Sequence, residues 1–379
     1  MKIINKLSVH IEDRKVGELA MAPDNRHCVF QYSREWLADG FSVSPLELPL
    51  RQGLFIAQKD SFAGNFGIFD DSIPDGYGRY LLSRLLRKQG IDASTLTPVQ
   101  MLSIVGESGM GALTYLPETF VGEDKALPEL DELQDLAFNV LSEKSDKDED
   151  VLYFNSGNSG GCRPKCLMKD DEGEWLVKFR HVYDPADFGK MEYDYNVAAA
   201  ACGIEVPEFK LIDNKYFASK RFDVRDGKRL HVATAGALLG LSLNELTMDY
   251  RNLLHLTGFL TQDPAQVEQQ FRRMVFNVIA ENKDDHPKNF SFICEDGAWR
   301  ISPAYDLTLC REGYRGEHAT SVMGNGLPTK ADLVNAGTDI KIPESRCQEI
   351  IEEIAATCER LLKGYSTELQ LNNHLSSNF

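Results

Sequence analysis

A helix, a polar loop and a hairpin in the last third of the chain constrain its fold more than any other feature. Apolar residues recur at helical spacing across 267–279 and predict a helix that leads into the polar loop 282–289. Two short apolar runs around Glu-Asp-Gly then predict a β-hairpin over 290–301. Because a hairpin places its two ends side by side, Asn289 at its entrance and Asp306 beyond its exit should lie close together.

The polar loop carries the residue types of a metal–nucleotide site. Four residues separate Asp284 from Asn289, and Asp306 follows Asn289 by seventeen positions. Protein-kinase catalytic loops have this spacing, with an Asp that accepts the hydroxyl proton and an Asn that holds magnesium, and a later Asp is the second metal ligand. These groups suit magnesium because it prefers oxygen ligands from one or two side chains plus substrate phosphates. The alternative is a solvated turn at 284–288, with Asp306 as the cap of a loop.

The composition is that of an acidic globular protein. With 379 residues, 42% of them hydrophobic, the chain can build a large core divided over two or three domains. Its 58 acidic and 41 basic residues leave a net charge of −17, which should repel DNA, because affinity for nucleic acid comes mainly from Lys and Arg. We therefore expect another subunit to make most of any contact with DNA.

Cysteine usage and the absence of long apolar runs predict a cytoplasmic protein. The eight cysteines are scattered without a CxxC pair, and we interpret them as reduced, mostly buried small hydrophobes. A zinc site at Cys162 and Cys166 would lack partner ligands. The N-terminus has no signal-peptide apolar stretch, and no run approaches the roughly 18 apolar residues of a membrane span.

The N-terminal third should combine a sheet with helices. Alternating apolar residues over 1–35 predict an antiparallel sheet, and we expect 41–45 to continue it. Helices should begin near Pro74 and Pro98. The glycine-rich stretch 106–113 lacks the Lys of a Walker phosphate loop, so we interpret it as a structural turn.

An acidic segment follows, and it predicts a domain boundary near residue 118. Residues 118–150 are rich in Asp and Glu, and their apolar residues form a single helical stripe. We expect a connecting helix followed by a charged loop.

A loop of small residues precedes a strand that contains a lysine. The loop runs from Asn155 to Lys165, and its backbone N–H groups are free to face phosphate oxygens. In the predicted strand 174–179, Lys178 lies among apolar neighbours and needs an anionic partner, for which a nucleotide phosphate would serve. The alternative is that Lys178 extends to a surface carboxylate. Glu192, on a predicted helix, is a candidate partner for Lys178, as the helix Glu is in protein kinases.

The remainder should be mostly helical. Residues 205–212 and 215–222 predict a strand pair, and the linker after it is where adenine lies in a kinase-like cleft. Residues 234–263 and 345–366 predict helices.

Taken in order, these motifs resemble the HipA toxin-kinase family along nearly the whole chain. The N-terminal subdomain of that family is matched by Ile73-Pro74-Asp75-Gly76 and by the glycine-rich stretch ending at Leu113. Its kinase region is matched at Ser159 to Lys165, Lys178, Arg221-Phe222-Asp223, Asp284 to Phe290 and Pro303 to Leu307.

The resemblance implies an α+β fold with a kinase-like two-lobed core. The N-terminal subdomain would hold a mixed or antiparallel sheet, and the C-terminal lobe would be mostly helical. The implied units are the N-terminal subdomain at 1–117, the acidic connection at 118–150, the nucleotide-binding part of the kinase core at 151–222 and the helical catalytic lobe at 223–379.

The resemblance also implies an activity: a serine/threonine protein kinase that depends on ATP and magnesium and acts as the toxin of a toxin–antitoxin pair. Asp284 would be the catalytic base, and Asn289 and Asp306 would bind magnesium. The residues implied in ATP binding are Gly160, Gly161, Cys162, Arg163, Pro164, Lys165, Lys178, Lys220, Arg221, Phe222, His286, Pro287, Lys288 and Tyr305. The family's usual partner is a small helix-turn-helix antitoxin (HipB-like), which binds operator DNA and recruits the toxin, and a dimer within such a complex is compatible with this. Known substrates include aminoacyl-tRNA synthetases.

Two positions depart from the family pattern. Lys220 stands where many members carry Glu near the adenine, although this position can act through its backbone. Asn158 stands where some members autophosphorylate a serine, so Ser156 and Ser159, which flank it, are the candidates for this modification.

Two other functions stay open at this point. One is a catalytically silent nucleotide-binding module that holds an antitoxin on DNA, against which the complete set of Lys, Asp, Asn and Asp argues. The other is a kinase for the hydroxyl of a small molecule or a lipid headgroup, which the catalytic loop would also serve.

Overall fold

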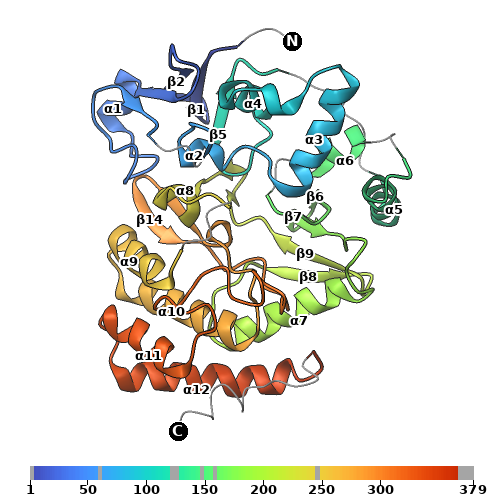
Figure 1. Ribbon diagram of the computed structural model, residues 1–379, viewed down its shortest axis with the longest axis vertical. Helices are drawn as coiled ribbons and strands as arrows, with labels where there is room; N and C mark the ends of the chain where they lie inside the picture. The colour runs from blue at the N-terminus through green and yellow to red at the C-terminus, as the bar shows by residue number, and fades with distance from the viewer. Residues whose placement is uncertain are drawn as a thin grey trace.

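The computed structural model describes residues 4–58, 62–119, 128–145, 149–156, 160–243 and 248–365, and Figure 1 shows the arrangement of their helices and strands. The strands are β1 (Lys6–Ile11), β2 (Arg14–Met21), β3 (Cys28–Tyr32), β4 (Phe55–Ile56), β5 (Leu113–Leu116), β6 (Lys165–Asp170), β7 (Gly173–Lys178), β8 (Phe209–Ile212), β9 (Tyr216–Lys220), β10 (Val224–Arg225), β11 (Lys228–Arg229), β12 (His231–Thr234), β13 (Ser291–Glu295) and β14 (Ala298–Ile301). The helices are α1 (Arg34–Asp39), α2 (Gly67–Asp70), α3 (Gly76–Lys88), α4 (Pro98–Val105), α5 (Leu130–Leu141), α6 (Glu149–Ser156), α7 (Phe188–Ala201), α8 (Ala235–Leu239), α9 (Tyr250–Thr261), α10 (Pro264–Ile279), α11 (Lys330–Asp339) and α12 (Glu344–Leu361), with 3₁₀ turns η2 (Ala93–Thr95) and η3 (Pro287–Asn289).

An antiparallel sheet forms the N-terminal part of the molecule, at the top of Figure 1. Its order is β4-β3-β2-β1-β5, and the alternation predicted over 1–35 is confirmed, with side chains such as Leu7 and Leu19 buried on one face. The predicted strand at 41–45 is wrong, because this segment lies outside the sheet as a loop. Pro45 has no N–H group to donate to a ladder, which disfavours a strand at this point.

The helices predicted in the N-terminal third and in the acidic segment are confirmed as α3, α4 and α5. Helix α4 begins where Thr97 accepts a hydrogen bond from the N–H of Gln100 and Gln100 bonds back to Thr97, which is a capping box. Helix α5 is the predicted acidic connection, and its apolar stripe packs inward through Leu133, Ala137 and Val140.

A second antiparallel sheet has the order β6-β7-β9-β8. The strands predicted at 174–179 and 215–222 are confirmed as β7 and β9, while β8 begins only at Phe209. Helix α7 packs against β8 and β9, so the helix that carries Glu192 lies against the sheet that carries Lys178.

The C-terminal lobe is mostly helical and lies at the bottom of Figure 1. Helix α10 confirms the helix predicted at 267–279, and Phe271, Met274 and Val275 are fully buried on its inner face. The segment predicted as helical at 234–263 contains two separate helices, α8 and α9, because Gly240 ends α8 in the left-handed conformation, with φ 68°. Within the described ranges, no helix combines the length and apolarity needed to cross a bilayer.

The predicted hairpin is confirmed as β13 and β14, and β12 adds a third strand to it. Phe292 faces Ile301 in the hairpin register, and Thr234 faces Ser291 across the other edge. The loop that ends at Asn289 and the loop that leads to Asp306 therefore emerge at the same end of this small sheet. The molecule has the expected α+β, kinase-like fold, whereas the exact limits of its four units stay a prediction.

Candidate active site

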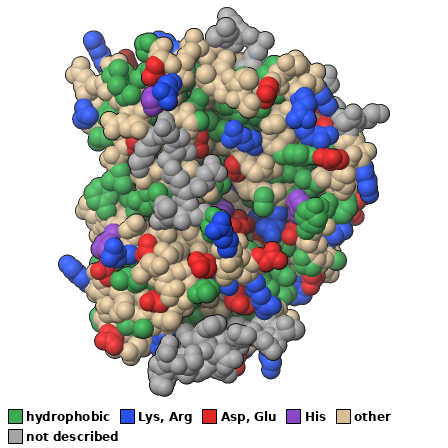
Figure 2. Space-filling view, in the orientation of Figure 1, with side chains coloured by type: hydrophobic (Ala, Val, Ile, Leu, Met, Phe, Trp, Pro, Cys, Tyr) green, Lys and Arg blue, Asp and Glu red, His purple; other side chains and the backbone are tan. Residues whose placement is uncertain are grey.

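A cavity of about 220 Å³ lies where the N-terminal sheet domain, the β6–β9 sheet and the loop before β13 meet. On the face shown in Figure 2, charged side chains of both signs gather in a hollow near the centre. Most of the residues predicted for a nucleotide site line the cavity, namely Gly160, Gly161, Lys165, Lys178, Lys220, Arg221, Phe222, His286, Lys288, Asn289, Tyr305 and Asp306.

Lys178 lies between two carboxylates. Its Nζ is 2.7 Å from Glu192 Oε1, which confirms the predicted pair, and it also contacts Asp306 Oδ1. Burial would raise the pKa of Asp306, but the charges of Lys178, Lys165 and Arg163 hold this pKa well below its usual range. For Glu192 burial prevails and raises the pKa despite Lys178.

The two carboxylates differ because their surroundings differ. The side chain of Glu192 is 1% exposed, and its Oε2 has no hydrogen-bond partner among the described residues. Asp306 is 28% exposed to the cavity and has additional cations nearby. Asp306 is therefore the carboxylate that a ligand can reach, and Glu192 serves to hold Lys178.

Two lysines face the cavity from neighbouring strands. Lys165 on β6 pairs in register with Lys178 on β7, and both are nearly buried. Burial and the charge of Lys178 lower the pKa of Lys165, whose Nζ donates to the carbonyl of Gly160. Two cations held side by side under a glycine loop form a site suited to a phosphate group.

Four predicted nucleotide residues do not line the cavity: Cys162, Arg163, Pro164 and Pro287. Arg163 instead makes a double hydrogen bond to Asp184, with Nε–Oδ2 and Nη2–Oδ1 distances of 3.0 and 3.2 Å. Its guanidinium also lies 4.2 Å from the ring centre of Phe188. Asp184 was not foreseen, because nothing in the local sequence links it to the glycine loop.

Asp284 and Asn289 lie on one short loop that ends in η3. Asn289 Nδ2 donates to the carbonyl of Asp284 over 2.7 Å, so Asn289 Oδ1 is the atom available to a ligand. Burial raises the pKa of Asp284, the negative charge of Asp306 adds to this rise, and His286 and Arg163 act against it. The two carboxylates therefore lie close enough to influence each other, although Asp284 itself does not line the cavity.

Asp285 anchors this loop from behind, a role that the sequence did not reveal. Its carboxylate accepts hydrogen bonds from Tyr250 Oη at 2.7 Å, from His318 Nδ1 at 2.9 Å and from the N–H of Thr320 at 3.2 Å. The Asp285 side chain is buried, and the hydroxyl of Thr320 also donates to its carbonyl. An Asp beside a second Asp suggests a solvated turn in the sequence, yet here it joins the loop to the segment after Asp306.

Two stacked aromatic side chains line one part of the cavity. Phe222 stacks on Tyr305, with ring centres 5.5 Å apart and planes at 28°. Tyr305 Oη donates to the carbonyl of Lys288 over 2.6 Å, which fixes this ring against the loop 282–289. Such a pair of rings next to a strand edge is suited to a flat, apolar base.

The two basic residues that precede Phe222 have carboxylate partners. Arg221 donates to Asp223 with distances of 2.7 and 3.0 Å, and Asp223 is buried. Lys220 Nζ lies 2.9 Å from Glu208 Oε2, and both side chains are partly exposed, so its charge is turned toward solvent.

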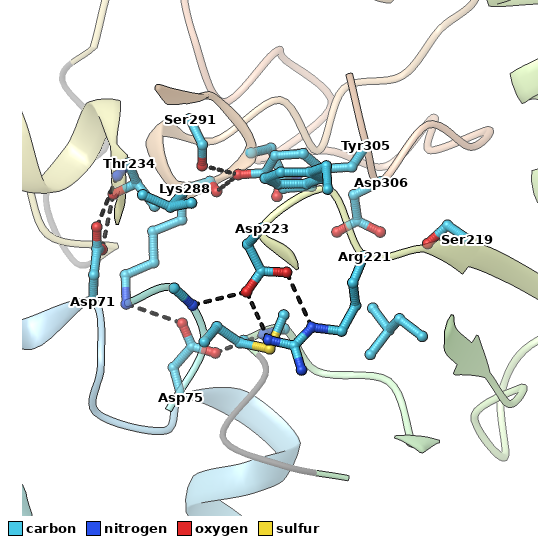
Figure 3. Close-up of a pocket in the computed structure, with 18 of the residues that line it drawn as sticks. Asp71, Asp75, Ser219, Arg221, Asp223, Thr234, Lys288, Ser291, Tyr305 and Asp306 are labelled. Carbon is cyan, nitrogen blue, oxygen red and sulfur yellow. Dashed lines mark hydrogen bonds and ion pairs between the residues drawn. The ribbon is translucent and has the colours of Figure 1, made fainter. Parts of the chain in front are cut away.

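The N-terminal domain supplies one wall of the cavity, as Figure 3 shows. Asp71 accepts hydrogen bonds from the N–H and hydroxyl of Thr234, at 2.8 and 2.9 Å, and Asp75 lies 3.0 Å from the Nζ of Lys288. These contacts join segments far apart in the sequence, so no local pattern indicated Asp71 or Asp75 as site residues.

The two serines proposed for autophosphorylation are placed differently. Ser156 is buried at the end of α6, and its hydroxyl donates to the carbonyl of Tyr153 over 3.1 Å. Ser159 lies outside the described residues. Modification at either position stays a prediction.

The donor set fits a nucleotide-bound magnesium ion. Asn289 and Asp306 offer one amide oxygen and one carboxylate oxygen toward the same cavity. Magnesium takes one or two such protein ligands when phosphate oxygens and water complete its octahedral shell.

Comparisons with known proteins agree with this geometry. The family model of the HipA N-terminal domain matches residues 7–116, and that of the HipA-like C-terminal domain matches residues 157–362. A curated protein named "Putative kinase Y4dM", from Sinorhizobium fredii, is 24% identical over an alignment of 348 residues, and the match covers 85% of this chain and 81% of that protein. The HipA chain solved with HipB and operator DNA from Shewanella oneidensis MR-1 superposes with a TM-score of 0.71 at 17% identity, over 94% of this chain and 90% of that one. The chain therefore belongs to the HipA family, with a HipA N-terminal domain joined to a HipA-like C-terminal domain.

Proposed function

We propose that this protein is a serine/threonine protein kinase that uses ATP and magnesium and acts as the toxin of a toxin–antitoxin pair. The observation that carries the proposal is the contact between Lys178 and Asp306 in a cavity that Asn289 also lines. Asp284 is tied to Asn289 at the edge of this cavity. Membership of the HipA family and a relative named as a kinase support the proposal.

In the proposed complex, ATP lies along the length of the cavity. Lys165 and Lys178 bind its phosphates, under the backbone of Gly160 and Gly161, and the base lies toward Phe222. Phosphoryl transfer asks for positioning and charge stabilisation more than for covalent chemistry by the protein, and a cavity lined by two fixed lysines meets this need.

The reacting groups then have defined roles. Asp284 accepts the proton of the substrate hydroxyl while the new oxygen–phosphorus bond forms and the bond from the γ-phosphorus to ADP breaks. Burial raises the pKa of Asp284, which makes it a stronger proton acceptor than an ordinary carboxylate. Magnesium, held by Asn289 and Asp306, would neutralise charge on the phosphates.

The proposed partners rest on the Shewanella relative and on the net charge of this chain. The Shewanella HipA is described together with HipB and operator DNA. For this chain we propose a HipB-like antitoxin that makes most of the DNA contact, since a net charge of −17 opposes direct binding. The substrate is a protein hydroxyl, with an aminoacyl-tRNA synthetase as the first candidate.

The test uses radiolabelled ATP and a cell extract, with the product separated by size. Wild-type protein and the surface variant Asp339→Asn should label a protein band, because Asp339 lies on α11, is 36% exposed, and its carboxylate pairs with His255 rather than with a residue of the cavity. Asp284→Asn and Asp306→Asn should each reduce labelling by roughly 10²–10⁴-fold, the usual contribution of such groups. Growth arrest in cells should be strong with wild type and Asp339→Asn and weak with Asp284→Asn and Asp306→Asn.

The alternatives predict other results. Nucleotide binding without any labelled product would indicate a catalytically silent co-repressor. Label on a small molecule would indicate a metabolite or lipid kinase. Full labelling by both active-site variants would refute the kinase proposal itself.

A further inference from the structure

Asp75 occupies the N-cap position of α3 without capping that helix. Asp is among the preferred N-cap residues because its carboxylate accepts an N–H of the first turn. Here the Asp75 side chain makes no cap hydrogen bond. Its two oxygens instead contact other parts of the molecule, so capping α3 is not the role of this side chain.

The carboxylate of Asp75 joins the two loops that frame the cavity. Oδ1 accepts a hydrogen bond from the N–H of Gly161 in the glycine loop over 2.6 Å. Oδ2 lies 3.0 Å from Nζ of Lys288, on the loop between Asp284 and Asn289. One side chain of the N-terminal domain, shown in Figure 3, thus contacts both the phosphate-side loop and the catalytic loop.

The backbone next to Asp75 reinforces this contact. The N–H of Tyr77 donates to the carbonyl of Gly161 over 3.0 Å. Gly76 has φ 45°, and a Cβ at this position would lie 2.5 Å from the Gly161 oxygen and 2.9 Å from Cα of Cys162. No side chain fits here, so residues 75–77 form a close-fitting support for the glycine loop.

The charge of Asp75 is maintained where it lies. Burial would raise its pKa, but Lys288 and the N–H of Gly161 lower it below the usual value. Lys288 in turn faces three carboxylates of the N-terminal domain, those of Asp70, Asp71 and Asp75. A lysine in the catalytic loop that would otherwise be free to attract phosphate is thereby neutralised.

We propose that Asp75 is a positioning residue of the nucleotide site, which fixes the glycine loop relative to the catalytic loop. The inference rests on the proposed kinase function and extends it, because it makes the N-terminal domain a working part of the site. Asp75 contributes one hydrogen bond that orders Gly161 and one ion pair that restrains Lys288. Asp75 itself does not contact the phosphates in this proposal, and it affects them only through Gly161 and Lys288.

The opposite view is that Asp75 is only one of several contacts that join the domains. Other contacts of that kind exist and do not reach the loops, such as His231 Nε2 to the carbonyl of Val43 at 2.8 Å. His231→Ala therefore serves as the matched control, since it removes a buried contact at the same interface and leaves Gly161 and Lys288 intact. The test variants are Asp75→Ala, which loses both contacts, and Asp75→Asn, which keeps an acceptor for Gly161 and loses the charge.

Three quantities are measured on the full-length protein. Hydrogen exchange of the peptide that contains Gly161 reports the loop itself. Calorimetric Kd for a non-hydrolysable ATP analogue reports binding, and kcat and KM for ATP report turnover. Because exchange needs neither ATP nor a substrate, the loop can be tested even if the protein proves not to be a kinase.

We expect Asp75→Ala to speed exchange at Gly161 and to lower kcat/KM at least tenfold, with a larger effect on kcat than on Kd. Asp75→Asn should restore slow exchange and recover kcat to within a few-fold. It should also bind the analogue at least as tightly as wild type, because Lys288 loses one of the three negative charges that offset its own. His231→Ala should lower Tm without changing the other quantities. The proposal is overturned if Asp75→Ala behaves like His231→Ala. It is also overturned if Asp75→Asn is as defective as Asp75→Ala, since the hydrogen bond to Gly161 would then not matter.

Discussion

Replacing Glu192 should separate the stability of this protein from its activity. Its side chain is 1% exposed, its Oε2 has no partner among the described residues, and burial raises its pKa. An unpaired buried polar atom costs about 1–3 kcal/mol, and a hydrogen bond to a charged group contributes about 1.5–3 kcal/mol. In Glu192→Gln the amide oxygen still accepts from Lys178 while the buried charge disappears. Because these changes oppose each other, we expect the free energy of unfolding to change by less than about 1 kcal/mol.

Lys178→Met provides the contrast. It removes the shared cation and leaves both Glu192 and Asp306 without it. Asp306 still has the positive charges of Lys165 and Arg163 nearby, so Glu192 is the carboxylate that loses its main compensating charge. Breaking a buried pair in this way costs about 3–5 kcal/mol, because an uncompensated charge stays behind.

Urea unfolding at pH 7 distinguishes the two variants. If both keep the wild-type slope m, the difference between their midpoints gives the difference in the free energy of unfolding. Transfer of labelled phosphate should fall in both. In Glu192→Gln it should fall at least tenfold, equivalent to about 1.4 kcal/mol in the transition state, because a neutral amide holds the Lys178 ammonium less firmly than a carboxylate does. If Glu192→Gln lost as much stability as Lys178→Met, the charge of Glu192 would be stabilising and the reasoning would be wrong.

Three further predictions concern residues around the site. Burial lowers the pKa of His231 from 6.5 to about 4, so the unfolded chain binds a proton that the folded protein does not. Stability should therefore fall by about 3 kcal/mol as pH drops from 7 to 4, and His231→Gln should lose that part of the pH dependence in urea titrations. Asp285→Ala should lower the free energy of unfolding by about 3–5 kcal/mol, since it strands three buried donors, and a urea midpoint close to wild type would contradict this. Lys220→Glu should leave the calorimetric Kd for ATP within about twofold, because the Lys220 side chain pairs outward with Glu208; a larger change would place its charge at the nucleotide.

The sequence was sufficient to predict those features that depend on residues close to one another in the chain. The spacing of Phe271, Met274 and Val275 identified α10, and the apolar runs around Glu-Asp-Gly identified the β13–β14 hairpin. The Lys178–Glu192 pair was also predictable, because a lysine within an apolar strand needs an anion and the next helix offers one.

Local pattern failed where a partner lies far along the chain. Asp75 is separated by 86 positions from Gly161 and by 213 from Lys288. The motif around it indicated the start of a helix and a resemblance to the HipA N-terminal subdomain, but no role in the site. Asp285 received no role of its own from the sequence beyond the alternative of a solvated turn, yet its partners come from α9 and from the segment after Asp306. Side chains that bridge domains leave no periodic signal, so only the assembled fold reveals them.

The charge arrangement of the cavity predicts that metal and nucleotide bind cooperatively. Lys178 is occupied by Asp306, and Lys288 by Asp75, so each cation is already partly neutralised before a phosphate arrives. A magnesium ion on Asp306 would compete with Lys178 for the same carboxylate and leave the lysine freer to bind phosphate. We therefore expect calorimetry to give a Kd for ATP at least tenfold lower with magnesium than with chelator. In Asp306→Asn, Lys178 is already released from that carboxylate, so most of the difference should vanish and affinity in chelator should rise. Equal magnesium dependence in wild type and Asp306→Asn would mean that the ion acts elsewhere and that Asp306 does not couple the two ligands.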